Sequence, residues 1–195
     1  MGTQSAIGSA PKIAFVTSLT ELATTDKEGA GTVRTDQYGQ KYRWVKNKSD
    51  DAAKAGAPAC FDASDVAASF LQEVVTEDLA TADEWFLAGV FISAIAGGGW
   101  GWIMIEGKYD TARLEVTAAV QGAVLAAKIE TDVTGIGLDG MAYCFTPVAA
   151  AGYTGGADEI DWVANPHAVL LDTVATGSLS AATVPASASI WIKGL

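Results

Sequence analysis

Hydrophobic and polar residues alternate in several short segments of this chain, and glycines separate these segments. Alternation with a period of two is typical of a β-strand that has one face covered. Within residues 40–47, Tyr42 and Trp44 share one face, while Lys41, Arg43 and Val45 share the other. We therefore predict that the aromatic pair is buried and that the basic pair lies in solvent.

The same segment forms the second arm of a predicted hairpin. Residues 31–35 are the first arm, and residues 36–39 are the turn. Asp36 opens the turn by accepting hydrogen bonds from its own backbone, and Gly39 suits the left-handed position, which a side chain would disfavour. This is the clearest local structure that the sequence predicts.

A second pattern combines a glycine turn with an unusually apolar strand. Gly97, Gly98 and Gly99 open the turn, and residues 100–107 then place large apolar side chains on both faces. Such a run is typical of a strand that is buried on both sides or covered by a neighbouring subunit. The predicted core or interface anchors are Tyr42, Trp44, Trp100, Trp102, Ile103 and Ile105.

Further short strands are expected along the rest of the chain. With the strand at residues 100–106, they are predicted at residues 12–18, 58–61, 85–95, 112–116, 123–131, 142–148, 162–163, 168–172 and 187–193. Apolar residues at four-residue spacing predict one helix over residues 65–78, which Asp65 would cap. The predicted fold class is mostly β: a compact β-sandwich or barrel-like domain with short strands, glycine-rich turns and at most one or two short helices.

The chain is long enough for one large domain or two small ones. Residues 1–11 are small and polar, and they are expected to form a flexible arm that becomes ordered on a partner. Residues 12–152 are the expected main β-rich domain. Residues 153–195 form a C-terminal β segment, for which membership of the same domain stays open.

The amino-acid composition suggests that this chain has a protein partner. Hydrophobic residues make up 50% of the chain and charged residues only 18%, against about 25% charged in an average soluble domain. Part of the surface is therefore expected to be covered by other subunits, a large single core being the alternative. The net charge of −11 argues against partners that are nucleic acids or anionic membranes.

Neither a membrane span nor a secretory signal is expected, because no apolar run reaches about 18 residues and the N-terminal segment lacks a basic start. We expect the chain to fold in cytoplasm, with Cys60 and Cys144 as thiols rather than a disulfide.

Candidate chemistry is sparse, and no enzyme is expected. His167 is the only histidine, and it lies in a predicted turn. Asp158, Glu159 and Asp161 could offer oxygen ligands to a cation, but they match no calcium-loop spacing. The glycine run is followed by no helix and no phosphate-binding lysine. We therefore predict no catalytic residues, no metal and no cofactor. The six tryptophans leave open a sugar-stacking surface.

Two segments resemble proteins of a known class. Residues 31–33 and 36–47 resemble a stretch common in small structural proteins of tailed bacteriophages. Residues 100–107, followed after a gap by residues 121–125, resemble the later part of the same proteins, where an aromatic strand leads to a small-residue turn and another strand. These proteins are similar to capsid decoration (cement) proteins.

The resemblance implies a function as well as a fold. It implies a β-rich and often trimeric protein that binds the major capsid protein on the outside of the virion and stabilises the shell. Such a protein would be made in the cytoplasm of the bacterial host, and no catalytic residue is carried over from the family. The alternatives are a tail, head-fibre or connector component and a carbohydrate-binding module.

Overall fold

The structure is a computed structural model that describes residues 15–49, 52–61, 73–75, 87–114, 121–127, 145–147, 168–173 and 186–193. The described residues form strands but no helix. The strands are β1 (Val33–Thr35), β2 (Lys41–Asn47), β3 (Pro58–Phe61), β4 (Glu73–Val75), β5 (Leu87–Phe91), β6 (Trp100–Leu114), β7 (Val124–Ala127), β8 (Phe145–Pro147), β9 (Ala168–Leu170) and β10 (Ala186–Lys193).

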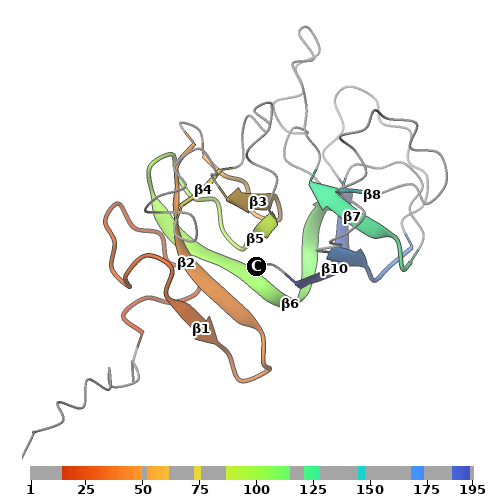
Figure 1. Cartoon of the computed structure of the whole chain (residues 1–195), viewed down its shortest axis with the longest axis horizontal. Coiled ribbons are helices and arrows are strands. Elements are labelled where there is room, and N and C mark those ends of the chain that lie inside the picture. The colour runs from red at the N-terminus through yellow and green to blue at the C-terminus, as the bar shows by residue number, and fades with distance from the viewer. Residues whose placement is uncertain are drawn as a thin grey trace, which may run out of the picture.

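Strand β6 organises the molecule (Figure 1). It is 15 residues long and pairs antiparallel with β2, β5 and β10. The sequence predicted separate strands at residues 100–106 and 112–116, and this division is wrong. Glycine at position 107 allows one strand to continue. Its φ of 133° is one that side chains rarely adopt, and a Cβ at this position would lie too close to Gln40.

The strand pairings run in two circuits that share β6. One circuit passes from β2 through β4, β3 and β5 to β6, which also pairs with β2. The other passes from β6 through β10, β9 and β7 to β8, which pairs with β6 again. Some of these pairings are short, with two residue pairs between β2 and β4 and one between β6 and β8. The prediction of a mostly β chain is confirmed, but a closed barrel or a sandwich is not.

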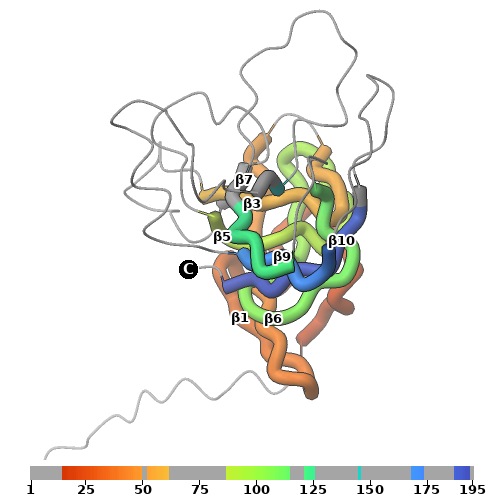
Figure 2. The backbone as a smooth tube through the Cα atoms, turned by 90° about the vertical axis from the view of Figure 1, so that its right-hand side faces the viewer, coloured from red at the N-terminus to blue at the C-terminus, as the bar shows by residue number. Residues whose placement is uncertain are grey.

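The C-terminal strands lie in the same sheet as the rest. Strand β10 pairs with β6 over most of its length, and β9 joins β10 to β7. The perpendicular view also places β9 and β10 beside β6 (Figure 2). Residues that are far apart in sequence therefore build the second circuit.

The predicted hairpin is present as β1 and β2. Asp36 Oδ1 accepts hydrogen bonds from the backbone N–H groups of Tyr38 and Gln40, at 2.8 and 2.9 Å. Gly39 adopts a φ of 81°, in the left-handed region that the turn requires. The local turn chemistry was therefore read correctly from the sequence.

The prediction that the basic pair of β2 lies in solvent is wrong for Arg43. This residue is only 8% exposed, and its guanidinium carbon lies 5.4 Å from the centre of the Phe61 ring. Burial lowers the pKa of Arg43. The physical reason is that β2 is covered on both faces, so alternation along the strand does not separate a wet face from a dry one.

Two clusters of buried side chains occupy the two faces of β2 and β6. The first contains Trp44, Trp102 and Met104. It continues along β6 to Leu114 and includes Ile190 of β10. The second is smaller and includes Val45, Phe61, Phe91, Ile95 and Ile103. Residues 101–105 of β6 are buried throughout, as the sequence predicted for a strand covered on both sides.

Two other local predictions are wrong where the structure describes them. Residues 15–18, expected to be part of a strand, have no strand structure. Residues 73–75, expected to be helical, form β4 between β2 and β3. The β-branched Val74 and Val75 suit a strand, and pairing with two neighbours outweighs the helical spacing. The rest of the predicted helix and the strand at residues 162–163 lie outside the described residues.

Candidate functional site: a covered aromatic cluster and an open sheet face

The predicted anchor residues lie inside the chain itself. Trp102 is 1% exposed, and all the others except the partly buried Trp100 are buried as well. The buried anchors are Tyr42, Trp44, Trp102, Ile103 and Ile105. Their side chains therefore build the core of this protomer.

Ring contacts give this cluster a defined geometry. The rings of Trp44 and Trp102 meet edge-on with centroids 5.4 Å apart, and Phe15 meets Trp102 edge-on at 5.7 Å. Trp100 stacks on Trp44 at 6.5 Å with only 15° between the planes. Edge-on and offset arrangements are the favourable ones for aromatic pairs, worth about 0.5–1.5 kcal/mol each beyond the buried area.

Residues 15–31 cover one face of this cluster and accept its hydrogen bonds. Trp44 Nε1 donates to Asp26 Oδ1 at 2.9 Å, and Trp102 Nε1 donates to Thr17 Oγ1 at 2.9 Å. Thr17 in turn donates from its backbone N–H and its hydroxyl to Glu28 Oε1, at 2.6 and 2.7 Å. Because each indole N–H has an acceptor, both tryptophans can be buried without an unsatisfied donor.

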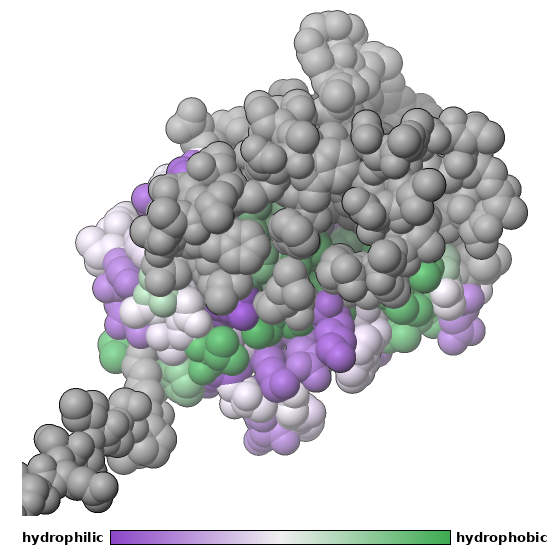
Figure 3. Space-filling model, viewed as in Figure 1, coloured by the Kyte–Doolittle hydropathy of each residue, from purple (hydrophilic) through white to green (hydrophobic). Residues whose placement is uncertain are grey.

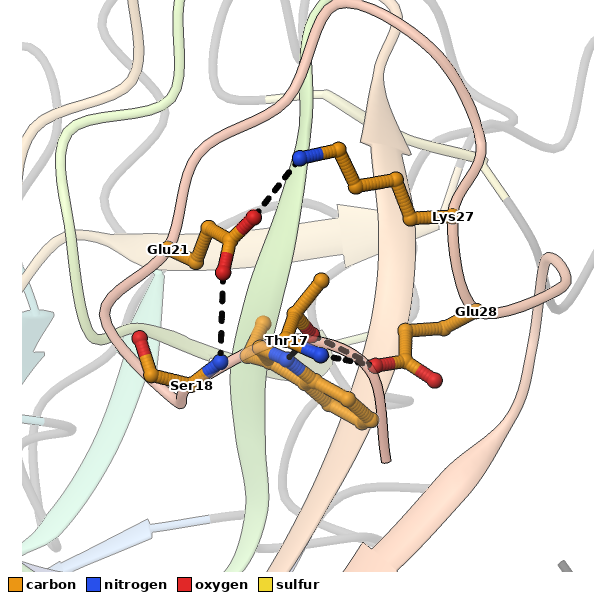
Figure 4. Close-up of polar contacts among 6 residues, drawn as sticks. Thr17, Ser18, Glu21, Lys27 and Glu28 are labelled. Carbon is orange, nitrogen blue, oxygen red and sulfur yellow. Dashed lines mark hydrogen bonds and ion pairs between the residues drawn. The ribbon is translucent and has the colours of Figure 1, made fainter. Parts of the chain in front are cut away.

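The covering layer is held in shape by its own polar contacts (Figure 4). Lys27 Nζ lies 2.7 Å from Glu21 Oε1, and the Ser18 N–H donates to Glu21 Oε2 at 3.4 Å. The hydrogen bond from Lys27 lowers the pKa of Glu21. The backbone of Ala23 exchanges two hydrogen bonds with Trp100, at 2.8 and 3.0 Å. The local sequence of these residues gave no sign of this covering role.

From Glu106 onward, β6 carries charged side chains on one exposed face, which we call the open face. Lys41 Nζ lies 2.7 Å from Glu106 Oε2, and Lys108 Nζ lies 2.6 Å from Asp110 Oδ1. The hydrogen bond from Lys41 lowers the pKa of Glu106, and the hydrogen bond from Lys108 lowers that of Asp110. Glu106 and Asp110 are therefore charged at neutral pH, and Lys108 lies between them on β6.

Trp191 stands on this open face and is 49% exposed. It lies opposite Lys108 of β6 on one side and opposite Val169 of β9 on the other. Directly opposed residues of neighbouring strands have their side chains on the same face. The sequence predicted a strand here, but Trp191 was not among the predicted anchors. The alternation of the strand could have identified it: Ala188, Ile190 and Ile192 are buried, so Trp191 between them points to the other face.

Polar groups lie on the same face of the sheet as this tryptophan. Ser189 Oγ donates to Asp110 Oδ1 at 3.2 Å, and the Ser189 N–H donates to Asp172 Oδ2 at 3.1 Å. The bonds from Ser189 lower the pKa of Asp172, and the hydrogen bond and charge of Asp110 raise the pKa of Lys108. The result is a sheet face that carries an aromatic ring, two carboxylates and an ammonium group.

Other exposed apolar residues belong to the N-terminal part of the described chain. Val16 is 73% exposed, and Leu22, Val33 and Tyr38 are also exposed. The space-filling view shows hydrophobic groups among hydrophilic ones on the described surface (Figure 3). Strand β1, which carries Val33, pairs only with β2 among the described strands.

Most of the candidate catalytic and metal-binding residues lie outside the described residues. This holds for His167, Cys144 and the acidic residues 158–161. Cys60 is buried in the core. Among the described residues, no group of three or more histidines, cysteines or carboxylates could hold a metal ion. In the same part of the chain, no helix has the length and apolar character for a bilayer span.

Comparisons with known proteins found no match among family models, curated proteins or solved structures.

Proposed function

We propose that this chain is a structural protein of a bacteriophage virion, bound to the outside of the capsid lattice as a decoration protein. The observation that carries the proposal is the set of exposed apolar side chains at Val16, Leu22 and Val33. They lie in residues 15–35, next to the N-terminal segment for which the sequence predicts an arm that becomes ordered on a partner. Apolar side chains exposed in this way are removed from water when a neighbouring subunit covers them.

The resemblance of residues 31–33, 36–47, 100–107 and 121–125 to phage decoration proteins supports the same proposal, and it implies the major capsid protein as the partner. The two strand circuits that share β6 support a stiff, barrel-like body for the protomer. Self-association into a trimer would multiply the shell contacts, so that weak individual contacts act together.

Co-sedimentation with shells that lack this protein tests the proposal. We expect the purified chain to sediment with such shells and to form a trimer in analytical ultracentrifugation. Val16→Asp and Val33→Asp should weaken shell binding at least about tenfold, which is 1.4 kcal/mol, because each places a charge in the apolar contact. Thr111→Asp, an exposed position at the far end of β6, is the matched control and should bind as the parent does.

Labelling of whole particles separates the proposal from its nearest alternative. Antibody label spread over the capsid faces supports a decoration protein. Label confined to a tail or a single vertex contradicts it and supports a tail, head-fibre or connector component.

A further inference from the structure

The exposed face around Trp191 is chemically unlike the other exposed apolar surface. Among the residues that the structure describes, the other large exposed apolar side chains all lie between Val16 and Tyr38. That part of the chain contacts β2 and the start of β6, at Trp100 and Trp102. Strand β10 instead pairs along the opposite edge of β6: Glu106 lies opposite Lys41 on one side and opposite Lys193 on the other. Trp191 is therefore a single large aromatic ring in a charged and polar setting, which is not the composition of a protein–protein contact centre.

The groups beside the ring can both donate and accept hydrogen bonds. Lys108 and Lys193 offer ammonium donors, while Asp110 and Asp172 offer carboxylate oxygens. Each carboxylate accepts bonds within the chain but keeps further lone pairs for a ligand. Two positive and two negative groups make this patch close to neutral, on a chain whose net charge is −11.

We propose that the face formed by Lys108, Asp110, Asp172 and Trp191 binds a neutral oligosaccharide of β-linked glucose or N-acetylglucosamine. The ring C–H groups of such a sugar form a flat apolar face that stacks on an indole, and its vicinal hydroxyls pair with adjacent carboxylates and ammonium groups. An acidic glycan would meet Asp110 and Asp172 and is disfavoured. The outward position of Trp191 on a sheet strand suits the flat stacking, because Ile190 and Ile192 anchor the strand in the core.

Titration of the full chain with cellohexaose, chitohexaose and oligogalacturonate tests this site, with the heat of binding as the readout, because a variant without Trp191 lacks the fluorophore that would report binding. We expect saturable binding of one or both neutral glycans and none of the acidic one. Trp191→Ala should weaken the binding at least about tenfold, and Asp110→Asn should weaken it less. Tyr38→Ala is the matched control, since Tyr38 is an exposed aromatic residue in the β1–β2 turn, and it should bind normally.

Several results would overturn the proposal. They are the absence of binding to both neutral glycans, equal binding by Trp191→Ala with native circular dichroism, and loss of binding in Tyr38→Ala. If Trp191→Ala lost shell binding while no glycan bound the parent, the face would belong to a protein partner. Glycan binding and shell binding are measured separately, so failure of one proposal leaves the other standing.

Discussion

Trp102 and Trp191 are the same residue type in the same sheet, with opposite environments. Trp102 of β6 is 1% exposed, packs against Trp44 and Phe15, and donates its indole N–H to Thr17. Trp191 of β10 is 49% exposed and lies opposite the charged Lys108. Strand pairing alone does not distinguish them, because both strands are well paired within the sheet.

The difference lies in what covers each face. Residues 15–31 lie over the tryptophan cluster of β2 and β6 and supply Thr17 and Asp26 as acceptors. Over Trp191 the chain leaves the ring half in water. A large aromatic residue on a sheet is therefore core or binding surface according to whether another segment of the chain reaches it.

Truncation of the two tryptophans should produce the largest contrast. We expect Trp102→Ala to lower the free energy of unfolding by about 3–5 kcal/mol, because it removes a buried ring and leaves a cavity. Trp191→Ala should cost only about 1 kcal/mol, since half of its surface is already solvated. Chemical denaturation measures both, and equal losses would contradict the division into a covered and an open region.

Alanine substitutions at two glycines with positive φ, Gly56 and Gly98, should distinguish the cost of backbone strain from the cost of a steric clash. A Cβ on Gly56 would lie 2.3 Å from the carbonyl oxygen of Thr111, whereas one on Gly98 would have no atom within 4 Å. We expect Gly56→Ala to cost about 3 kcal/mol and Gly98→Ala about 1 kcal/mol, because only the first adds overpacking to the left-handed strain. Thermal unfolding of the pair gives the measurement, and similar values would mean that Gly56 is not tightly enclosed.

Removal of the Thr17 hydroxyl tests the covering layer directly. Thr17→Val keeps the shape but leaves the Trp102 N–H without its acceptor, so we expect a loss of about 2 kcal/mol. Thr17→Ser keeps the hydroxyl and should lose clearly less. If the two variants were equally stable in urea, the hydrogen bond would not be what keeps the layer on the cluster.

The last effect is expected only at alkaline pH and concerns Tyr42, a buried member of the covered cluster. Burial, together with the nearby Asp36 carboxylate, raises the pKa of Tyr42 from 10.0 to about 12. The unfolded phenol loses its proton first, so this contribution to stability is fully present below pH 10 and is lost as the pH rises through 12.

Tyr42→Phe should therefore lose less stability than the parent over this alkaline range. The free energy of unfolding of parent and variant, measured in urea at a series of pH values and compared with the phenolate absorbance, tests this prediction. The prediction fails if the stabilities of parent and variant fall in parallel.

How far the sequence predicted the structure can be judged from particular residues. The turn from Asp36 to Gly39 and the strand at residues 58–61 were predicted with their bounds. The burial of Arg43, the continuity of β6 through Gly107 and the strand at residues 73–75 were not. Each of these depends on a neighbour distant in the chain: Phe61 for Arg43, Gln40 for Gly107, and β2 and β3 for β4.

The candidate site divides in the same way. The aromatic anchors were identified from the sequence, which left open whether they are core or interface, while Trp191 was missed. Thr17, Asp26 and Glu28 could not have been found, because a hydrogen bond between Thr17 and Trp102 spans 85 positions in the chain.

Local sequence was enough to predict a mostly β chain and the position of its clearest hairpin turn, because alternation and turn chemistry act between residues close in the chain. Which faces of the sheet are dry depends instead on how distant segments pack together. Burial depends on two surfaces meeting, and here residues 15–31 reach the tryptophans of β2 and β6 while Trp191 stays exposed.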